Sequence, residues 1–314
     1  MNKTIRIGTR ESQLALWQAN TVKELLSQNG YNAELVLIKS EGDIDLKTPL
    51  YELGVQGIFT RALDIALLSD EIDIAVHSMK DVPTIMAKGI VQAAVLPRAS
   101  HKDLLVLKSG VSVQDLTTFE KLSNLSGSKV IATSSIRRKA QWLNRYPNDQ
   151  IENLRGNVNT RLRKVAESDW HGAIFAAAGL ERIGLRPENA VELDWMLPAP
   201  AQGAIIVVSK ESNIYCMEAC AHFHDMNTAL CTAIERDFLR ALLGGCSTPI
   251  SALAEVEGHE VVFRGNILSR DGKQKKEVIK TAVISEAMNL GNIAAQELLA
   301  DGGQEILNGI RNEN

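Results

Sequence analysis

Cys246 stands in the sequence GGCSTPI, where two glycines precede the thiol and a proline follows it. A cysteine of a protein core usually has apolar neighbours on a strand or helix. Glycine instead lets the backbone turn sharply, and proline stiffens the chain beyond the turn. A thiol that backbone N–H groups can approach favours its thiolate form, which attacks electrophiles or carries a covalently attached group. The residue types leave both roles open.

Arginine supplies a second chemical signal, at or just after the ends of expected strands. A guanidinium meets a carboxylate with two parallel hydrogen bonds, and a strand end that leads into a helix favours anions. The chain has no GxxxxGK[ST] phosphate loop, so we expect a ligand with several carboxylates. For any single arginine, a solvated surface with scattered ion pairs is the alternative. The arginines are Arg10, Arg137, Arg138, Arg155 and Arg161.

The sequence AVHSMKDVPT gives a third signal, because an apolar strand ends there in polar residues. Asp81 directly follows Lys80, so a cation lies next to the carboxylate. A carboxylate in such a place can accept N–H donors, stabilise a developing cation or exchange a proton. The alternative is a turn aspartate before Pro83. For His77 we expect packing or a local hydrogen bond rather than catalysis.

The composition bounds the class of protein. The chain has 314 residues, 45% of them hydrophobic, which is enough for two or three domains. The net charge of −4 indicates neither a nucleic acid nor a membrane surface as partner. No segment approaches the roughly 18 apolar residues of a membrane-spanning helix. The first residues, MNKTIRIGTRESQ, lack the apolar core of a secretory signal, so we expect a cytoplasmic protein.

The cysteine count indicates neither disulfides nor a metal. Four cysteines are too few for a disulfide framework in a chain of 314 residues. Cys216, Cys220, His222 and His224 lie close together, but their spacing matches no established zinc pattern. We therefore expect no metal site.

Two similar α/β lobes are expected, because a strand–helix–strand–helix–strand pattern occurs twice. Short β-branched strands are typical of sheets that helices cover on both faces. Each lobe has a strand that passes through small polar residues into a helix carrying a tryptophan. A separate α+β module follows, with a helix over 227–245, strands over 252–285 and a final helix over 286–302. The two runs cover residues 4–78 and 129–179.

Seven motifs now support a resemblance. The chain contains, in order, GTRESQLALWQ, DIAVHSMKDVP, ATSSIRRKAQ, LRGNVNTRL, AGLERIGL, LPAPAQGA and GGCSTPI. Together they resemble the porphobilinogen deaminase family, whose members are also called hydroxymethylbilane synthases. The resemblance covers essentially the whole chain.

The resemblance implies an α/β fold with two periplasmic-binding-protein-like lobes, each a mixed sheet with flanking helices, plus a small C-terminal α+β domain. Residues 1–98 and 200–220 would form the first lobe, because LPAPAQGAIIVVSK would cross back to complete it. Residues 103–198 would form the second lobe, and residues 223–314 the domain that carries Cys246.

The resemblance also implies the activity, a transferase reaction of tetrapyrrole and haem biosynthesis. Four porphobilinogen molecules are joined head to tail with loss of ammonia, and hydrolysis then releases hydroxymethylbilane. The chain grows on a dipyrromethane cofactor, held here by a thioether to Cys246. Asp81 would be the catalytic residue, accepting pyrrole N–H bonds and stabilising the cation left by ammonia. The residues that would bind cofactor and substrate are Arg10, Ser12, Lys80, Ser135, Arg137, Arg138, Arg155, Arg161 and Arg182.

Three positions depart from the family pattern. Gln56 replaces a lysine of GGKGLF, which puts one ligand contact in doubt, and Lys47 is a candidate to compensate. Asn159 stands where glycine is common, a mild change if the backbone there is left-handed. Pro200-Ala201 replaces Val-Gly, which would stiffen the second crossing between the lobes.

Two other classes of protein compete with the deaminase. A two-lobed solute-binding protein would share the lobes but not need GGC in a third domain. A cysteine-nucleophile hydrolase would use Cys246 but leave the arginines without a role. The expected partner is porphobilinogen, with no nucleic acid or membrane, and the expected state is a monomer.

Overall fold

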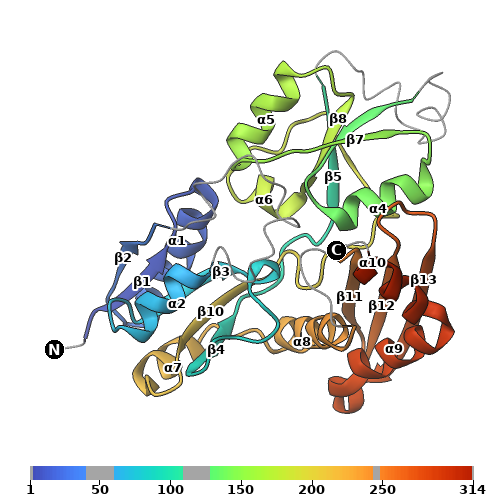
Figure 1. Ribbon diagram of the computed structural model, residues 1–314. Helices are drawn as coiled ribbons and strands as arrows, with labels where there is room; N and C mark the ends of the chain where they lie inside the picture. The colour runs from blue at the N-terminus through green and yellow to red at the C-terminus, as the bar shows by residue number, and fades with distance from the viewer. Residues whose placement is uncertain (1–2, 40–59, 109–127, 243–247, 313–314) are drawn as a thin grey trace.

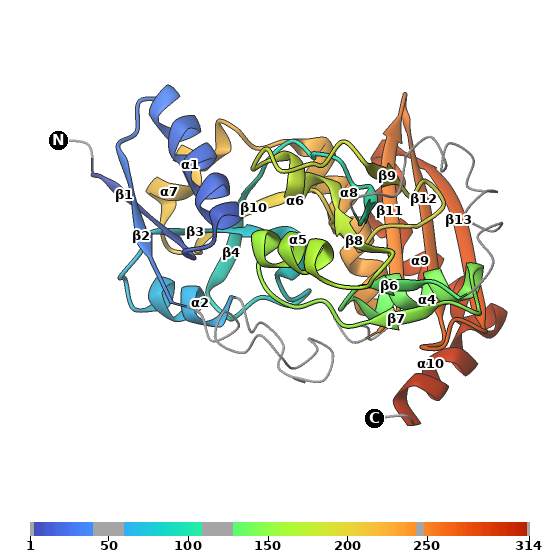
Figure 2. The same ribbon diagram turned by 90° about the horizontal axis from the view of Figure 1, so that it is seen from above.

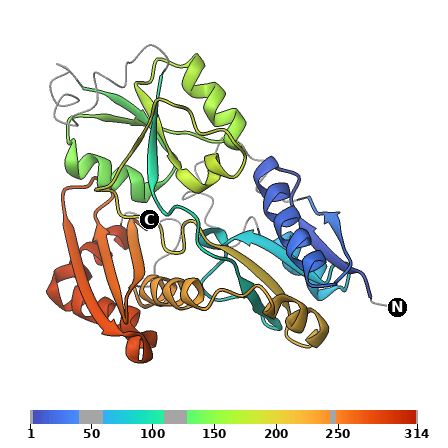
Figure 3. The same cartoon turned by 180° about the vertical axis from the view of Figure 1, so that it is seen from behind.

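The computed structural model describes residues 3–39, 60–108, 128–242 and 248–312, which form two lobes and a C-terminal domain (Figure 1). Cys246, Lys47 and Gln56 lie outside the described residues. The lobes are joined by two crossing segments, and the C-terminal domain lies beside both lobes (Figure 3). The two mixed sheets with flanking helices and the small third domain confirm the expected fold class.

The first lobe is a five-stranded sheet covered by helices on both faces. The strands β1, β2 and β3 are parallel to one another. The strand β10 lies between β3 and β4 in the sheet and is antiparallel to both. The strand β10 follows the second lobe in sequence, so the chain does cross back into the first sheet. Across the sheet, the order is β2 (Ala33–Leu37), β1 (Ile5–Thr9), β3 (Ile74–Ser78), β10 (Ile205–Lys210) and β4 (Ile90–Val95).

The helices of the first lobe follow from its apolar periodicity. Helix α1 (Gln13–Gln28) buries Ala15, Ala19, Val22 and Leu26 on one stripe, as an amphipathic helix should. Helix α1 and helix α7 (Ile214–Ala221) pack on one face of the sheet. Helix α2 (Arg61–Leu68) packs on the other face. The sheet is thus fixed from both sides, and its strand ends are held in place.

The second lobe repeats this arrangement. Helix α4 (Ile136–Arg145) covers one face of its sheet, while α5 (Val158–Glu167) and α6 (Ala177–Glu181) cover the other. Here β5, which follows the first crossing, is the antiparallel strand. Across the sheet, the order is β7 (Gln150–Glu152), β6 (Val130–Ala132), β8 (Gly172–Ala176), β5 (Asp103–Leu107) and β9 (Ala190–Glu192). The strands β4, β5 and β9 were not anticipated from the sequence.

The two crossings, residues 96–102 and 193–204, lie side by side. Ala99 N donates to Gly203 O over 3.1 Å, and Arg98 Nε donates to Gln202 O over 2.9 Å. Gly203 has a positive φ of 89°, and a Cβ there would lie 2.6 Å from Ala99 O. Ala201 is left-handed too, with φ 61°. The second crossing therefore turns tightly where it meets the first, and glycine is required at Gly203.

The C-terminal domain packs three helices on one three-stranded antiparallel sheet (Figure 2). Glu235, fully buried on its first helix, accepts hydrogen bonds from Ala254 N at 2.8 Å and Ala201 N at 2.6 Å and pairs with Arg98. This carboxylate thus ties the C-terminal domain to both crossings. The elements are α8 (Met226–Ala241), β11 (Ile250–Glu257), β12 (Glu260–Leu268), β13 (Lys275–Val283), α9 (Leu290–Leu298) and α10 (Gln304–Asn312).

Candidate functional site

The carboxyl ends of β1 and β3 place the polar residues of the first lobe. Ser12 caps helix α1, and its hydroxyl accepts a hydrogen bond from Ala15 N at 3.4 Å. Ser78 ends β3, where its hydroxyl accepts from Gln18 Nε2 at 2.8 Å. Parallel strands end at the same sheet edge, so these junctions lie next to each other.

Lys80 and Asp81 follow β3 in a single 3₁₀ turn, Met79–Asp81. Lys80 Nζ donates to Gln202 Oε1 over 3.3 Å. Burial, offset in part by the charge of Asp81, lowers the pKa of Lys80 to about 8. A lysine with this pKa loses its proton more readily than an exposed lysine does. A carboxylate ligand beside it would stabilise its charged form.

A buried carboxylate of the second lobe binds two of the expected arginines. Asp103 Oδ2 accepts from Arg137 Nη2 at 2.7 Å, and Asp103 Oδ1 accepts from Arg138 Nη2 at 2.7 Å. Gln202 Nε2 also donates to Asp103 Oδ1, over 2.8 Å. The two guanidinium groups hold the pKa of Asp103 far below its ordinary value despite its burial. Asp103 was not predicted as a site residue, since one aspartate before an apolar run has no distinctive pattern.

Arg137, Arg138 and the carboxylate of Asp103 together carry a net charge of about +1, because two cations face one anion. Both arginines are buried, with 4% and 6% of their surface exposed. Arg137 Nη1 donates to Leu197 O over 2.7 Å, but the buried Arg137 Nε has no hydrogen-bond partner among the described residues. Asp103 therefore holds both guanidinium groups in place, and, within the described part of the chain, Arg137 Nε is still available to donate a hydrogen bond.

Arg161 and Arg155 bring further positive charge from the start of helix α5. Arg161 Nε donates to Gly156 O over 2.7 Å, and Arg155 is buried. Burial, together with the charges of Arg138 and Arg155, lowers the pKa of Arg161 to about 10, while Asp81 acts in the opposite direction. Asp81 of the first lobe thus interacts electrostatically with Arg161 of the second.

Arg182 and the second crossing complete a small pocket between the lobes. Arg182 Nη2 donates to Gly203 O over 2.7 Å, and its guanidinium lies 5.7 Å from the ring centre of Trp17 on α1. Burial lowers the pKa of Arg182 to about 10. Both lobes contribute to the pocket, which is lined by Leu14, Ser78, Lys80, Ala176, Ala178, Gly179, Arg182, Gly203 and Ala204.

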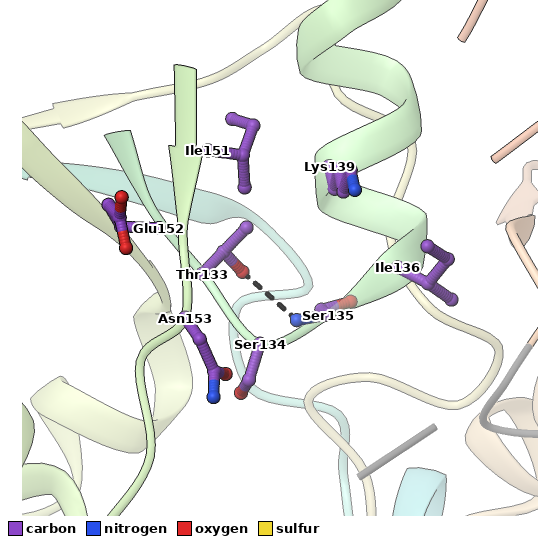
Figure 4. Close-up of a pocket in the computed structure, with 8 residues that line it drawn as sticks. All are labelled: Thr133, Ser134, Ser135, Ile136, Lys139, Ile151, Glu152 and Asn153. Atoms are coloured by element: carbon purple, nitrogen blue, oxygen red, sulfur yellow. Dashed lines mark hydrogen bonds between the residues drawn. The ribbon is translucent and has the colours of Figure 1, made fainter. Parts of the chain in front are cut away.

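A second pocket lies at the start of helix α4, where Ser135 caps the helix (Figure 4). Ser135 N donates to Thr133 Oγ1 over 3.2 Å, and Ser135 Oγ accepts from Arg138 N at 3.5 Å. The pocket also has Lys139 and Asn153 among its lining residues. The sequence signal of a strand end leading into a helix thus corresponds to a hollow with polar groups.

Two further expectations from the sequence concern the backbone of Asn159 and the side chain of His77. Asn159 lies inside helix α5 and not among the left-handed residues, so that interpretation was wrong; its Nδ2 donates to Gln13 Oε1 of the other lobe over 2.9 Å. His77 is buried, which lowers its pKa to about 3, and its Nε2 has no hydrogen-bond partner among the described residues. Packing or a local hydrogen bond was expected for His77, and the burial of its side chain agrees with packing.

The cysteines other than Cys246 lie in apolar cores. Cys216 and Cys220 belong to the core of the first lobe, where burial raises the pKa of Cys220 to about 12. His224 Nδ1 accepts a hydrogen bond from Val95 N at 3.0 Å. The described ranges contain no group of three or more His, Cys, Asp or Glu side chains that could hold a metal. Within the same ranges, no helix is long and apolar enough to cross a membrane.

The site residues that the structure describes suit a ligand that carries several carboxylates, such as the dipyrromethane cofactor. Lys80 interacts electrostatically with Asp81, Arg137 and Arg138, so cations from both lobes surround one place. Arg137 Nε, which has no hydrogen-bond partner within the described residues, adds a buried donor. Arg10 lies close enough to His77 to lower the pKa of that imidazole, which places it at the same sheet edge. A neutral or cationic ligand would leave these charges uncompensated.

Comparison with known proteins covers nearly the whole chain. Residues 5–218 match the family model of the porphobilinogen deaminase dipyromethane cofactor binding domain, and residues 229–300 match that of the porphobilinogen deaminase C-terminal domain. The porphobilinogen deaminase of Syntrophotalea carbinolica is 39% identical and covers 98% of this chain and 96% of its own. The porphobilinogen deaminase of Geotalea uraniireducens is 40% identical, and the match covers 97% of this chain and 94% of that protein.

Solved structures share less with the chain. The structure titled Ancestral Cationic Amino Acid Solute Binding Protein (AncCDT-1) covers 70% of this chain and 87% of its own, with a TM-score of 0.41 and 14% identity. This weak likeness carries no argument about function. The family matches do not favour the solute-binding or hydrolase alternatives; from residue 5 to residue 300, the chain belongs to the porphobilinogen deaminase family.

Proposed function

We propose that this chain is a hydroxymethylbilane synthase in which Asp81 acts on the reacting pyrroles and Cys246 holds the dipyrromethane cofactor. The observation that carries the proposal is the meeting of Asp81 and Lys80 with buried arginines of the other lobe. The substrate is porphobilinogen, whose acetate and propionate groups call for cationic partners. Membership of the family supports the activity, and the site geometry supports the residue roles.

The cofactor would be held by its carboxylates and by one covalent bond. Arg137, Arg138, Arg155 and Arg161 would bind the carboxylates, since all four are buried or nearly so beside the second-lobe strand ends. Arg10, Ser12, Ser135 and Arg182 would contribute further contacts from the surrounding junctions and pocket walls. When bound, the cofactor supplies a two-pyrrole primer on which the product is built.

Asp81 would work through its charge and its place opposite Arg161. Loss of ammonia from porphobilinogen leaves a cation, and a carboxylate held nearby lowers the energy of that cation. Lys80 and Arg161 on either side would bind carboxylates of the same substrate, which fixes its position against Asp81. Because these groups belong to different lobes, the site is complete only when both lobes face the ligand.

The intact mass of the purified protein tests the proposal. We expect a covalent excess equal to two linked pyrroles, a positive colour reaction with Ehrlich's reagent, and turnover of porphobilinogen. Cys246→Ala should lose the excess mass and the colour reaction together. Cys231→Ala is the matched control, because Cys231 lies buried in the C-terminal core and should not affect the adduct. An active protein of unmodified mass would defeat the proposal.

The proposal extends to a monomer that works in the cytoplasm, and membership of the family supports both properties. Light scattering of the purified protein should give the mass of one chain. Cell fractionation should recover the chain with cytoplasmic markers. A stable dimer, or recovery in an exported fraction, would contradict this part while leaving the chemistry untouched.

A further inference from the structure

Arg236 of the C-terminal domain contacts the turn that carries Asp81 in the first lobe. Its Nη1 donates to Val82 O over 2.9 Å and to Met79 O over 3.4 Å. Its Nη2 donates to Pro83 O over 2.6 Å. These carbonyls flank Asp81 on both sides, so one guanidinium spans the turn. The planar fork of arginine suits several fixed acceptors, which the single ammonium of lysine matches less well.

The helix that carries Arg236 is itself fixed. The neighbouring Glu235 binds Ala254 N of β11 and Ala201 N of the second crossing, and it pairs with Arg98 of the first crossing. Burial lowers the pKa of Arg236 to about 10, which still leaves it charged at neutral pH. Helix α8 therefore gives Arg236 a rigid base from which to hold the turn.

We propose that Arg236 is a positioning residue that sets the place of Asp81 relative to the C-terminal domain. Helix α8, which holds the turn of Asp81, ends at Ala241, and Cys246 follows five residues later in the sequence. The contact lets the C-terminal domain fix Asp81 from outside the two lobes. This inference rests on the proposed role of Asp81 and deepens it.

The position of Asp81 matters because reacting groups work only at short range. A displacement of the order of 1 Å far from the reacting atoms can lower a rate by about a hundredfold. Without the guanidinium, three carbonyls of the turn lose their donor, and the turn is free to relax. Substrate carboxylates still meet Arg137, Arg138 and Arg161, so binding should suffer less than the chemical step.

The experiment compares Arg236→Gln with Arg236→Lys in the intact holoenzyme. For Arg236→Gln we expect a kcat lower by roughly 10- to 100-fold, a KM for porphobilinogen within about threefold of that of the wild type, and an unchanged cofactor mass. Arg236→Lys keeps the charge and should recover part of kcat. Arg240→Gln is the control on the same helix, because Arg240 is half exposed and pairs only with Asp237 among the described residues; its kcat should not change.

A double-mutant cycle with Asp81→Asn separates positioning from a general structural role. Pyrrole addition is followed by intact mass, which detects slow steps. If Arg236 acts through Asp81, Arg236→Gln should lower the rate by less than about twofold in the D81N background. An equal loss in both backgrounds, or a wild-type kcat in Arg236→Gln, would overturn the inference. If Arg236→Gln gives no folded holoenzyme, the cycle with Arg236→Lys decides by the same comparison.

The wild-type protein in the same assay keeps the two proposals apart. If it neither carries the adduct nor consumes porphobilinogen, the proposed function fails. If it does both and the cycle shows independent effects, only the positioning role of Arg236 fails.

Discussion

Lys80 and Asp103 belong to different lobes and are joined through one side chain, that of Gln202. The amide oxygen of Gln202 accepts from Lys80 Nζ at 3.3 Å, and its nitrogen donates to Asp103 Oδ1 at 2.8 Å. Asp103 in turn binds Arg137 and Arg138. One buried carboxylate thus holds Arg137 and Arg138 directly and Lys80 through Gln202, and these four charged groups together leave an excess of positive charge for a ligand.

The first prediction concerns Asp103. Asp103→Asn leaves two buried guanidiniums without their counter-charge, so we expect the free energy of unfolding to fall by about 3–5 kcal/mol. Chemical denaturation followed by circular dichroism measures this loss. Glu192→Gln is the control, because Glu192 is 42% exposed in its pair with Arg186 and should change stability by less than about 1 kcal/mol. Equal small effects would show that the Asp103 network is not structural.

The second prediction is a loss of substrate affinity at alkaline pH. Lys80 has a pKa lowered to about 8, so its ammonium deprotonates as the pH rises through that value. kcat/KM for porphobilinogen should therefore fall above about pH 8. Lys80→Arg keeps a charge at high pH and should move this decline upward by more than one pH unit. An unchanged decline in Lys80→Arg would assign it to another group.

The lowered pKa of Lys80 also makes the stability of the folded protein depend on pH. Unfolded Lys80 keeps its proton up to the ordinary pKa of 10.5, while the folded protein releases it near 8. Between these values the unfolded state binds more protons, so the contribution of Lys80 to stability rises with pH. Lys80→Met should flatten this rise in the midpoint of thermal unfolding. A slope that Lys80→Met leaves unchanged would contradict it.

Much of the fold was predictable because it depends on local pattern. The amphipathic stripe of Leu14, Trp17, Val22, Leu25 and Leu26 predicts α1, and the apolar residues at 74–76 predict β3. The helix is where this stripe predicts it, but its buried face is centred on Ala15, Ala19, Val22 and Leu26, and Trp17 is exposed. The strands β4, β5 and β9 were missed because their pairing partners lie far away in sequence. Val95, for example, pairs with Ile206. Periodicity within a short window carries no information on such long-range pairs.

The site was predictable in part, for a related reason. Arg137 and Arg138 stand out by type and by their place after a strand, but their binding to Asp103 depends on how the sheet of the second lobe packs. Ala201 is similar: sequence indicates a stiff crossing, whereas the left-handed φ of 61° arises from the tight turn against the first crossing. Residue type predicts chemistry, and tertiary packing decides which partners each residue has.

A fourth prediction contrasts two glycines of the C-terminal domain. A Cβ at Gly291 would collide with Ile234 O and lie 3.0 Å from Phe238 N, because α9 packs closely on α8. Gly291→Ala should therefore destabilise the domain by about 1–3 kcal/mol. Gly309 has open space around it inside α10, so Gly309→Ala should stabilise by about 0.5–1 kcal/mol. Calorimetry should give shifts of opposite sign; shifts of the same sign would refute the packing argument.

The last prediction concerns Asp81. Asp81→Asn removes the charge but keeps the size and much of the hydrogen bonding of the side chain, so the fold and the thioether to Cys246 should survive. Turnover should fall by about a hundredfold or more, because a neutral amide no longer stabilises the cation left by ammonia. Intact mass should show the dipyrromethane adduct, with porphobilinogen units added very slowly. The charge that Asp81 provides beside Arg161 would also be lost, and substrate carboxylates should then bind at least as tightly as before. Near-normal turnover in Asp81→Asn would remove Asp81 from the chemistry and leave it as a turn residue before Pro83.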